Sequence, residues 1–224
     1  MAEYKTSKIS KSKILEACKE LFYLKGYTNT TYNDICVKAD SNPGLINYYF
    51  KTKKNIAGMI YGDFFLQIKD KVKKFMLGTY GFYDLQYGTT LEHRIFKYLC
   101  KKDENINIFY YEISIEGIEY DLPILYEFFK LHVDEYHLNI SEDYTKLIQT
   151  ATIASGIGIT KRSVEGYFNI DGDTLFDFRQ NAMYNAMGIP KERIDEILRV
   201  TYDMFLKLQI ELEDYFMIHI TPKE

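Results

Sequence analysis

The sequence has little proline, glycine or cysteine and no tryptophan, with four prolines, thirteen glycines and three cysteines in 224 residues. Proline and glycine are the residues least compatible with helix interiors, so their scarcity favours a helical chain. Cys18, Cys36 and Cys100 lie far apart, and no C-x-x-C pair is present. We therefore expect neither a disulfide framework nor a zinc site, and we expect the protein to work in the reducing cytoplasm.

Long hydrophobic runs are also absent. The longest stretch without a charged residue covers the fourteen residues 147–160, which is too short to cross a lipid bilayer. The opening segment, MAEYKTSKISKSK, is basic but has no apolar segment behind it, so it does not resemble a signal peptide. The sequence therefore predicts no membrane partner.

The sequence patterns of catalysis and metal binding are missing as well. The chain contains no G-x-S-x-G, P-loop or G-x-G-x-x-G pattern. His132 and His137 are five residues apart, which places them on different sides of a helix. Asp134 and His137 have the i, i+3 spacing of di-metal helical bundles, but those sites need a second copy of the motif, which this sequence lacks. We predict no enzymatic activity, no metal and no cofactor.

Charge is distributed unevenly along the chain. Residues 1–54 contain ten lysines and five acidic residues, a net charge of +5, whereas the whole chain has a net charge of −4. A basic first quarter on an acidic body is typical of a small nucleic-acid-binding head. A lysine-rich segment that is merely solvated gives the same pattern, so charge alone leaves both interpretations open.

Apolar spacing and capping residues predict four helices in the first third of the chain. The first runs from about residue 11 to 25, and a short second helix follows Thr31, which is a good N-cap. Asn42 caps a third helix with Pro43 in its first turn, and Thr52 caps a fourth helix that continues to about residue 76. Three helices within fifty residues, with a tight turn between the second and the third, indicate a helix-turn-helix.

The third helix is predicted to bury Ile46 and Phe50 and to expose Gly44, Asn47 and Tyr48. An exposed glycine lets the backbone approach a base edge, and exposed polar and aromatic side chains contact bases and phosphates. The outward face of this helix therefore predicts a DNA-recognition surface.

Three lysines, Lys51, Lys53 and Lys54, stand at the start of the fourth helix. The helix dipole disfavours positive charge there. The placement becomes favourable if Lys53 and the free N–H groups of the helix together hold a DNA phosphate. We therefore expect a phosphate clamp directly after the recognition helix.

The run TTYNDICVKADSNPGLINYYFKTKKNI, residues 30–56, resembles the signature of the tetracycline-repressor (TetR) family of bacterial transcriptional regulators. A Thr-Thr opening, an Asp-Ile pair and an aromatic-aromatic-Phe-Lys-x-Lys close occur in the same order and spacing. The resemblance covers about residues 10–60. It departs at Asp40, which replaces a turn glycine, and at Ser41, which replaces an apolar residue and is expected to loosen the packing of the second and third helices. The positions that match are Thr31, Asp34, Ile35, Ala39, Gly44, Tyr48, Phe50, Lys51 and Lys53.

The resemblance implies an all-α protein with an N-terminal three-helix helix-turn-helix DNA-binding domain, residues 1–55. A long fourth helix joins it to a larger helical ligand-binding and dimerisation domain, residues 56–224. It further implies a regulator, more often a repressor, that binds a pseudo-palindromic operator in double-stranded DNA as a homodimer and responds to a small molecule. The DNA-contacting residues that it implies are Thr31, Ser41, Asn42, Pro43, Gly44, Leu45, Asn47, Tyr48, Tyr49 and Lys53.

Beyond residue 77 the pattern stays helical but carries no family signature. The glycine-rich segment 78–89 is expected to connect the fourth helix to the next. Further helices are expected near residues 89–101, 104–117, 122–138, 142–167, 173–187 and 190–217.

Two of these segments are candidates for the dimer interface. Residues 142–167 carry small side chains on one face, which admit either a neighbouring helix or a ligand, and residues 190–217 carry a long apolar stripe. In the family the last two long helices form the dimer interface, which favours the first interpretation. The candidate interface residues are Ala151, Ala154, Gly158, Thr201, Phe205, Leu208 and Leu212.

The resemblance also implies a small-molecule pocket in the helical body, and the high tyrosine content hints at an aromatic or amphipathic ligand. The candidate residues lie on helical faces that could converge, although each could equally be ordinary core. They are Phe65, Phe96, Tyr110, Tyr111, Phe128, His132, Tyr136, Thr152 and Ser155.

A second functional class remains open at this point. The helix-turn-helix could be structural, with the exposed Tyr48 and Tyr49 anchoring a protein partner in a helical interaction module. Salt dependence separates the two, because binding through phosphate contacts weakens steeply with salt and a tyrosine-based protein interface does so far less.

Overall fold

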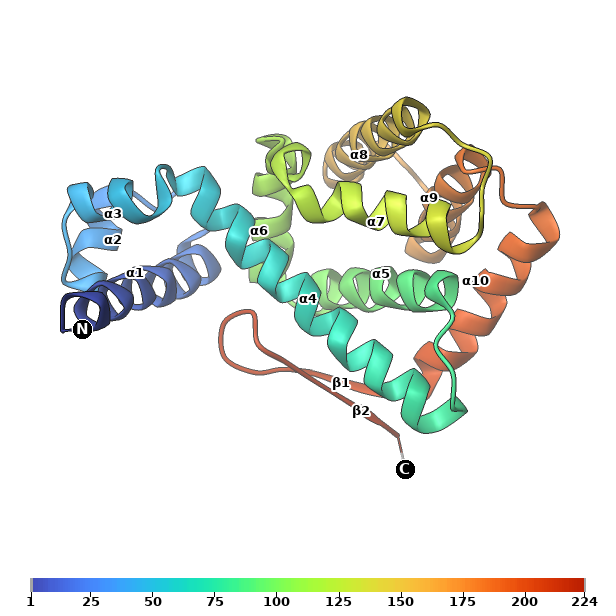
Figure 1. Ribbon diagram of the computed structural model, residues 1–224, viewed down its shortest axis with the longest axis horizontal. Helices are drawn as coiled ribbons and strands as arrows, with labels where there is room; N and C mark the ends of the chain where they lie inside the picture. The colour runs from blue at the N-terminus through green and yellow to red at the C-terminus, as the bar shows by residue number, and fades with distance from the viewer. Residues whose placement is uncertain (1, 224) are drawn as a thin grey trace.

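The computed structural model describes residues 2–223, which form ten α-helices, one 3-10 helix and one two-stranded sheet (Figure 1). No helix in this part of the chain is both long and apolar enough to span a membrane. The mostly helical architecture agrees with the prediction. The elements are α1 (Ala2–Lys25), α2 (Tyr32–Ala39), α3 (Pro43–Phe50), α4 (Lys53–Tyr80), α5 (Leu85–Lys102), α6 (Glu104–Ile115), η1 (Ile118–Asp121), α7 (Pro123–Glu135), α8 (Glu142–Val164), α9 (Gly172–Ala186), α10 (Lys191–Leu206), β1 (Leu208–Leu212) and β2 (Ile218–Pro222).

Helices α1, α2 and α3 pack together at one end of the molecule, and we call them the head (Figure 1). Each contributes apolar side chains to a shared interior, among them Phe22, Ile35 and Ile46, which are completely buried. These positions recur at helical spacing in the sequence, so amphipathic patterning explains the packing of the head.

The predicted N-caps of the head are all present. The Thr31 hydroxyl accepts the backbone N–H of Asp34, and the Asp34 carboxylate accepts the backbone N–H of Thr31 at 2.9 Å, which completes a capping box. Asn42 and Thr52 accept the backbone N–H groups three residues ahead of them, at 3.0 and 3.1 Å. Side-chain caps therefore set where α2, α3 and α4 begin.

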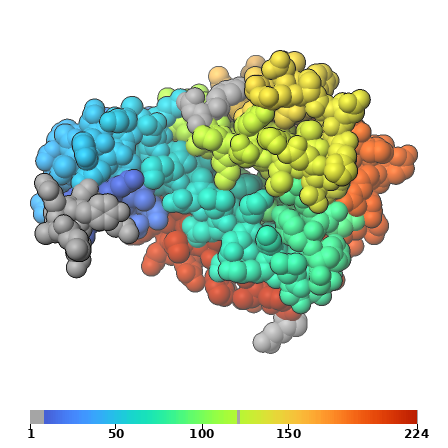
Figure 2. Space-filling model, viewed as in Figure 1, coloured from blue at the N-terminus to red at the C-terminus, as the bar shows by residue number. Residues whose placement is uncertain are grey.

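Helix α4 runs for 28 residues from the head into the remainder of the chain, which we call the body. It packs against α1 at its start and against α5 and β2 further along (Figure 1). In the space-filling view its surface continues without interruption from the head into the body (Figure 2). One helix therefore connects both halves of the molecule.

Helix α5 occupies the middle of the body, against α4, α6 and α10. Helices α7, α8 and α9 lie together on the opposite side from the sheet (Figure 1). The segment 78–89 is mostly helical instead of the expected connection, because α4 continues to Tyr80 and α5 already begins at Leu85. Gly81, with φ of 76°, ends α4 in the left-handed conformation that glycine adopts without strain.

The helix expected over residues 190–217 is wrong in its second half. Helix α10 ends at Leu206, and β1 pairs antiparallel with β2, with Leu208 opposite Pro222 and Leu212 opposite Ile218. Along β1 buried and exposed side chains alternate, which is the period of a strand. Apolar residues four positions apart lie on one side of a helix and also on one face of a strand, so the spacing of Leu208 and Leu212 fits both.

The turn between the two strands inserts Phe216 into the junction of head and body. Its ring lies 5.7 Å from Tyr23 of α1, 5.7 Å from Phe64 of α4 and 4.7 Å from Phe109 of α6. The side-chain amide of Gln67 donates to its carbonyl oxygen at 3.2 Å. The hairpin therefore contacts all three helices that meet where the head joins the body.

Two polar contacts reinforce this junction. The hydroxyl of Tyr23 donates to the Asp103 carboxylate at 2.7 Å. The backbone N–H of Thr28 donates to the Glu112 carboxylate at 3.1 Å. The head is consequently held by α6 and the hairpin as well as by α4.

Replacing Phe216 with alanine tests this junction. The change should lower the free energy of unfolding by about 3–5 kcal/mol, because the removed ring leaves a cavity among three helices. Met217→Ala is the matched control, since Met217 is the next residue and is 44% exposed, and it should cost less than about 1 kcal/mol. Urea denaturation followed by circular dichroism measures both. Equal small effects would show that the hairpin tip is dispensable.

Candidate nucleic-acid interface and ligand cavity

The exposed face of α3 consists of the residues that the sequence predicts. Gly44 and Asn47 are exposed and Tyr48 is 71% exposed, whereas Ile46 and Phe50 are buried. On the flanks, Leu45 and Tyr49 are half-buried, and the rings of Tyr48 and Tyr49 meet edge to face at 5.1 Å. The face is therefore flat near Gly44 and carries hydrogen-bonding groups one turn further on.

Both departures from the family signature lie in the turn between α2 and α3. Asp40 has φ of 47° and ψ of 57°, the left-handed conformation that aspartate tolerates better than most residues. The Ser41 hydroxyl is buried and has no hydrogen-bond partner among the described residues, as expected for a polar group in an apolar position. Thr31, Asn42 and Pro43 are exposed at the starts of α2 and α3.

The structure differs from the prediction at Lys53. Its ammonium donates to the carbonyl oxygens of Tyr27 and Thr30, each at 2.8 Å, and lies 4.3 Å from the centre of the Tyr27 ring. Burial lowers the pKa of this lysine. The ammonium therefore ties α4 to the turn between α1 and α2 and does not reach out as a phosphate clamp. Lys51, by contrast, is exposed.

Tyr32 is a residue of this region that the sequence did not single out. Its hydroxyl accepts the backbone N–H of Lys53 at 2.9 Å, and its side chain is 43% exposed. It therefore occupies one of the N–H groups at the start of α4 that were expected to face a phosphate. A partner 21 positions away in the sequence leaves no local signal, so periodicity could not reveal it.

A cavity of about 800 Å³ lies in the body, between α4, α5, α6, α7, α8 and α9. Aromatic rings form much of its wall and contact one another. The ring of Phe96 lies 4.8 Å from Tyr110, 5.8 Å from Tyr61 and 5.9 Å from Phe65. A mainly apolar cavity of this size is typical of small-molecule sites.

Five of the nine predicted ligand residues line this cavity. They come from α4, α5, α6, α7 and α8, and they are Phe65, Phe96, Tyr110, Phe128 and Thr152. Tyr111 and Ser155 are not part of the wall, and Ser155 is exposed on the outer side of α8. The structure places both away from this cavity. Helical spacing shows that residues share a face without showing what that face meets.

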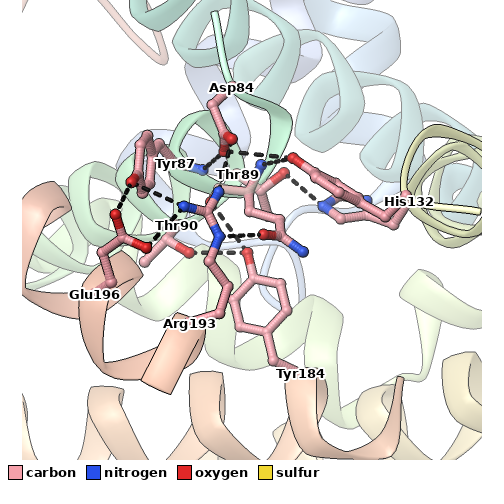
Figure 3. Close-up of polar contacts among 10 residues, drawn as sticks. Asp84, Tyr87, Thr89, Thr90, His132, Tyr184, Arg193 and Glu196 are labelled. Atoms are coloured by element: carbon pink, nitrogen blue, oxygen red, sulfur yellow. Dashed lines mark hydrogen bonds and ion pairs between the residues drawn. The ribbon is translucent and has the colours of Figure 1, made fainter. Parts of the chain in front are cut away.

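His132 and Tyr136, the other two predicted ligand residues, lie outside the cavity wall and belong to a polar network, in which Figure 3 shows His132. The Tyr136 hydroxyl joins this network by accepting the backbone N–H of Gln86 at 3.1 Å and donating to Asp84 at 3.3 Å. The backbone carbonyl of Phe128 lies 2.9 Å from Nδ1 of His132 and can only accept, so Nδ1 carries the proton. Burial lowers the pKa of this histidine to about 4. His132 is therefore neutral, and its Nε2 faces the Thr89 hydroxyl at 3.4 Å.

Arg193 of α10 stands at the centre of the same network (Figure 3). Its guanidinium donates to Asp84 at 2.6 Å, to Gln86 at 2.9 Å and to Tyr87 at 2.8 Å. These residues cap and begin α5, so the network fixes the start of α5 to α10. Tyr184 of α9 joins it through Thr90 at 2.9 Å.

The cavity also contains polar residues that the sequence analysis missed. Arg179 of α9 is half-buried and lines the cavity. The Glu119 carboxyl accepts the hydroxyls of Tyr61 at 3.2 Å and of Ser114 at 3.3 Å, and burial raises its pKa. Burial lowers the pKa of His93 to about 4, so this residue is a neutral partner of Gln180.

The predicted dimer residues fall into two groups. Ala151, Ala154 and Gly158 are exposed on one face of α8, as an interface requires. Thr201 is completely buried and Leu208 is 3% exposed. A side chain without accessible surface cannot contact a second chain, so the prediction is wrong for Thr201 and Leu208.

Phe205 and Leu212 are both half-buried, and the chain changes from helix to strand between them. They therefore do not share the continuous stripe that suggested them. The exposed apolar residues lie elsewhere: Leu147 of α8 is 63% exposed and Phe178 of the neighbouring α9 is 62% exposed.

Comparison with known structures supports the fold. RolR in complex with the ligand resorcinol superposes with a TM-score of 0.58 at 14% sequence identity, over 87% of this chain and 95% of that one. RolR without ligand gives a TM-score of 0.54 at 13% identity, over 84% of this chain and 96% of that one. At such low identity the likeness concerns the fold alone.

Comparison of sequences identifies the N-terminal region. Residues 14–58 match the family of bacterial regulatory proteins of the tetR type. An uncharacterized HTH-type transcriptional regulator of Lactococcus lactis subsp. lactis is 47% identical over 45 residues, 20% of this chain and 23% of that protein. The HTH-type transcriptional regulator QacR of Staphylococcus aureus strain Mu50 is 46% identical over 46 residues, 20% of this chain and 24% of QacR. The matched region thus spans about a quarter of each relative. Through it, residues 14–58 of the chain are similar to the helix-turn-helix region of bacterial regulatory proteins of the tetR family.

Proposed function

We propose that the protein is a ligand-responsive repressor that binds a pseudo-palindromic operator as a homodimer and is released or repositioned when a small molecule enters the body. The observation that carries this proposal is the course of α4. It begins at Lys53 in contact with the head and lines the cavity with Tyr61, Phe65 and Lys69. A ligand that displaces the wall of the cavity therefore acts on the helix that carries the head.

The exposed face of α3 supports DNA as the partner of the head. Asn47 and Tyr48 offer hydrogen-bonding groups on the surface, and Gly44 leaves the helix start open to a base edge. The N-terminus of α3 brings the positive end of a helix dipole to the same surface, which favours phosphate. Repression in the bacterial cytoplasm, where DNA is accessible, is the corresponding role.

A homodimer is supported by the exposed stripe on α8. Leu147, Ala151, Ala154 and Gly158 follow one another at intervals of four, three and four residues, and all are exposed. Such spacing places them on one side of the helix, where small side chains let a second helix approach closely. The exposed Phe178 of α9 extends the apolar surface. Two-fold pairing through these helices would present two heads to the two halves of an operator.

The cavity supports a small-molecule effector. RolR, which has a similar fold, was solved with the small aromatic compound resorcinol. A ring compound of that kind suits a cavity whose wall includes the rings of Phe65, Phe96 and Tyr110.

The test of DNA binding starts from random-sequence duplexes enriched by repeated capture on the purified protein. We expect an inverted-repeat site to emerge, and the logarithm of the association constant to fall linearly with the logarithm of the salt concentration. Fluorescence anisotropy at several salt concentrations measures this slope. The interaction-module alternative would be favoured if no DNA sequence is enriched. It would also be favoured if the chain binds another protein with an affinity that depends little on salt.

Substitutions on α3 should then reduce affinity for the enriched site. Asn47→Ala and Tyr48→Ala are each expected to cost about 1–3 kcal/mol, because they remove contacts to base edges or to the adjacent backbone. Phe82→Ala is the control, since Phe82 is 48% exposed but lies in the connection between α4 and α5. Gel-shift titration of all three variants measures the effect. Full affinity in both α3 variants would remove this helix from the interface.

Lys53 and Lys51 provide a matched pair for separating structural from DNA-contacting lysines. Lys53→Met should lower the free energy of unfolding by about 1–3 kcal/mol, because the carbonyls of Tyr27 and Thr30 lose their donor. Lys51→Met should leave stability within about 0.5 kcal/mol and weaken binding to all duplexes alike. Chemical denaturation and anisotropy titration distinguish the two. The reverse outcome would restore Lys53 as the phosphate clamp.

Arginine substitutions on α8 test the dimer. Ala154→Arg and Gly158→Arg should convert the dimer to a monomer, since each places a charged, bulky side chain between two closely packed helices. Gln209→Arg introduces the same side chain at an exposed position of β1 and should leave the dimer intact. Sedimentation velocity reports the mass directly. A wild-type monomer, or a dimer that survives both α8 changes, would contradict the proposed interface.

A further inference from the structure

Arg179 is a half-buried cation of the cavity wall that forms no ion pair with any described carboxylate. It projects from α9 into the cavity, and its neighbours are the phenols of Tyr110 and Tyr61 and the carboxyl of Glu119. Burial alone would lower its pKa, but these neighbours raise it, so the guanidinium stays charged. Both oxygens of Glu119 already accept hydroxyl groups, from Tyr61 and Ser114. The Tyr110 phenol is a hydrogen-bond partner of Arg179, and the guanidinium has further N–H donors that can face a ligand in the cavity.

Two other cations of the cavity wall have carboxylate partners. The ammonium of Lys69 lies 3.8 Å from the Glu92 carboxylate, and that of Lys97 lies 2.5 Å from Asp173. Arg179 differs from both, because no described carboxylate lies at ion-pair distance from its guanidinium. A partly desolvated cation without a counter-charge is unfavourable, and an anion that enters the cavity would supply that counter-charge.

Helix α8 makes room for this guanidinium. A Cβ atom added to Gly156 would lie 2.9 Å from Nη2 of Arg179. Gly156 is buried, whereas Gly158 of the same helix has no neighbouring atom within 4 Å of an added Cβ. The small residues of α8 therefore serve two purposes, since Gly156 faces the cavity while Gly158 faces outward.

From this arrangement we propose that the effector is a small aromatic carboxylate, bound with its carboxylate on Arg179 and its ring among Phe96, Tyr110 and Phe65. The planar guanidinium donates two parallel hydrogen bonds to a carboxylate, a geometry that a neutral amide or ester does not reproduce. The rings around Phe96 offer edges and faces at 4.8–5.9 Å from one another, which suits a planar aromatic body. Burial raises the pKa of Glu119, which reduces its repulsion of an incoming anion.

This assignment rests on the proposed function, in which the cavity receives an effector. The test uses 2-naphthoate and its neutral counterpart 2-naphthamide, which share a ring system and differ in charge. Isothermal titration calorimetry of the full chain should show 2-naphthoate binding at least about ten-fold more tightly. Arg179→Met should weaken 2-naphthoate binding by about 10–100-fold and change 2-naphthamide binding by less than about three-fold.

A second pair of variants keeps the test independent of how well Arg179→Met folds. Gly156→Ala should displace the guanidinium and weaken 2-naphthoate binding, whereas Gly158→Ala makes the same chemical change on the same helix and should not. Equal or tighter binding of 2-naphthamide by the wild type would overturn the proposal. So would failure of 2-naphthoate to bind at millimolar concentration, or unchanged 2-naphthoate affinity in both Arg179→Met and Gly156→Ala.

The DNA-binding titration separates this inference from the proposed function. Selective 2-naphthoate binding by a chain that binds no DNA would uphold the assignment of Arg179 and contradict the regulator. Salt-dependent operator binding without a preference for the carboxylate would overturn the assignment of Arg179 and leave the regulator standing.

Discussion

Helix α4 runs without a break from the head to the cavity, and the arrangement of the other elements follows from this. Its 28 residues form one uninterrupted helix, which at 1.5 Å per residue spans about 42 Å. Lys53, at its first turn, is bonded to the turn between α1 and α2, while Tyr61 and Phe65 reach the cavity two to three turns later. Head and cavity are therefore joined by one continuous helix, which is the route of coupling in the proposed function.

The contacts around α4 determine what such a displacement costs. Phe216 packs against α1, α4 and α6 at once, so the head cannot move without disturbing the hairpin tip. On the far side of the body, Arg193 and its partners fix the start of α5 to α10. The cavity thus lies between a rigid network at one end and the head junction at the other. Of its walls, α4 continues to the head, and α6 contacts the head.

The two glycines of α8 illustrate how one helix serves two surfaces. Gly156 is pressed against Arg179 inside the cavity, and Gly158 lies open to solvent on the opposite side. Each interior glycine lowers helix stability by about 1 kcal/mol relative to alanine. A glycine is needed where another group approaches the helix closely. At Gly156 this group is a guanidinium, and at Gly158 it is a partner helix in the proposed dimer. The sequence alone left these two interpretations as alternatives, whereas in the fold Gly156 faces the cavity and Gly158 is exposed to solvent.

The sequence by itself determined the head and most helix boundaries, because caps and amphipathic spacing act within a few residues. Thr31, Asn42 and Thr52 each satisfy N–H groups three positions away, and the burial of Ile46 and Phe50 follows from helical spacing. Only the tertiary structure decided the hairpin after Leu206, since a spacing of four residues fits a helix and a strand equally. It also decided the inward turn of the Lys53 side chain and the place of Arg179 in the cavity. Those outcomes depend on partners from distant segments, such as Tyr27, Tyr110 and Glu119, and local periodicity contains no record of them.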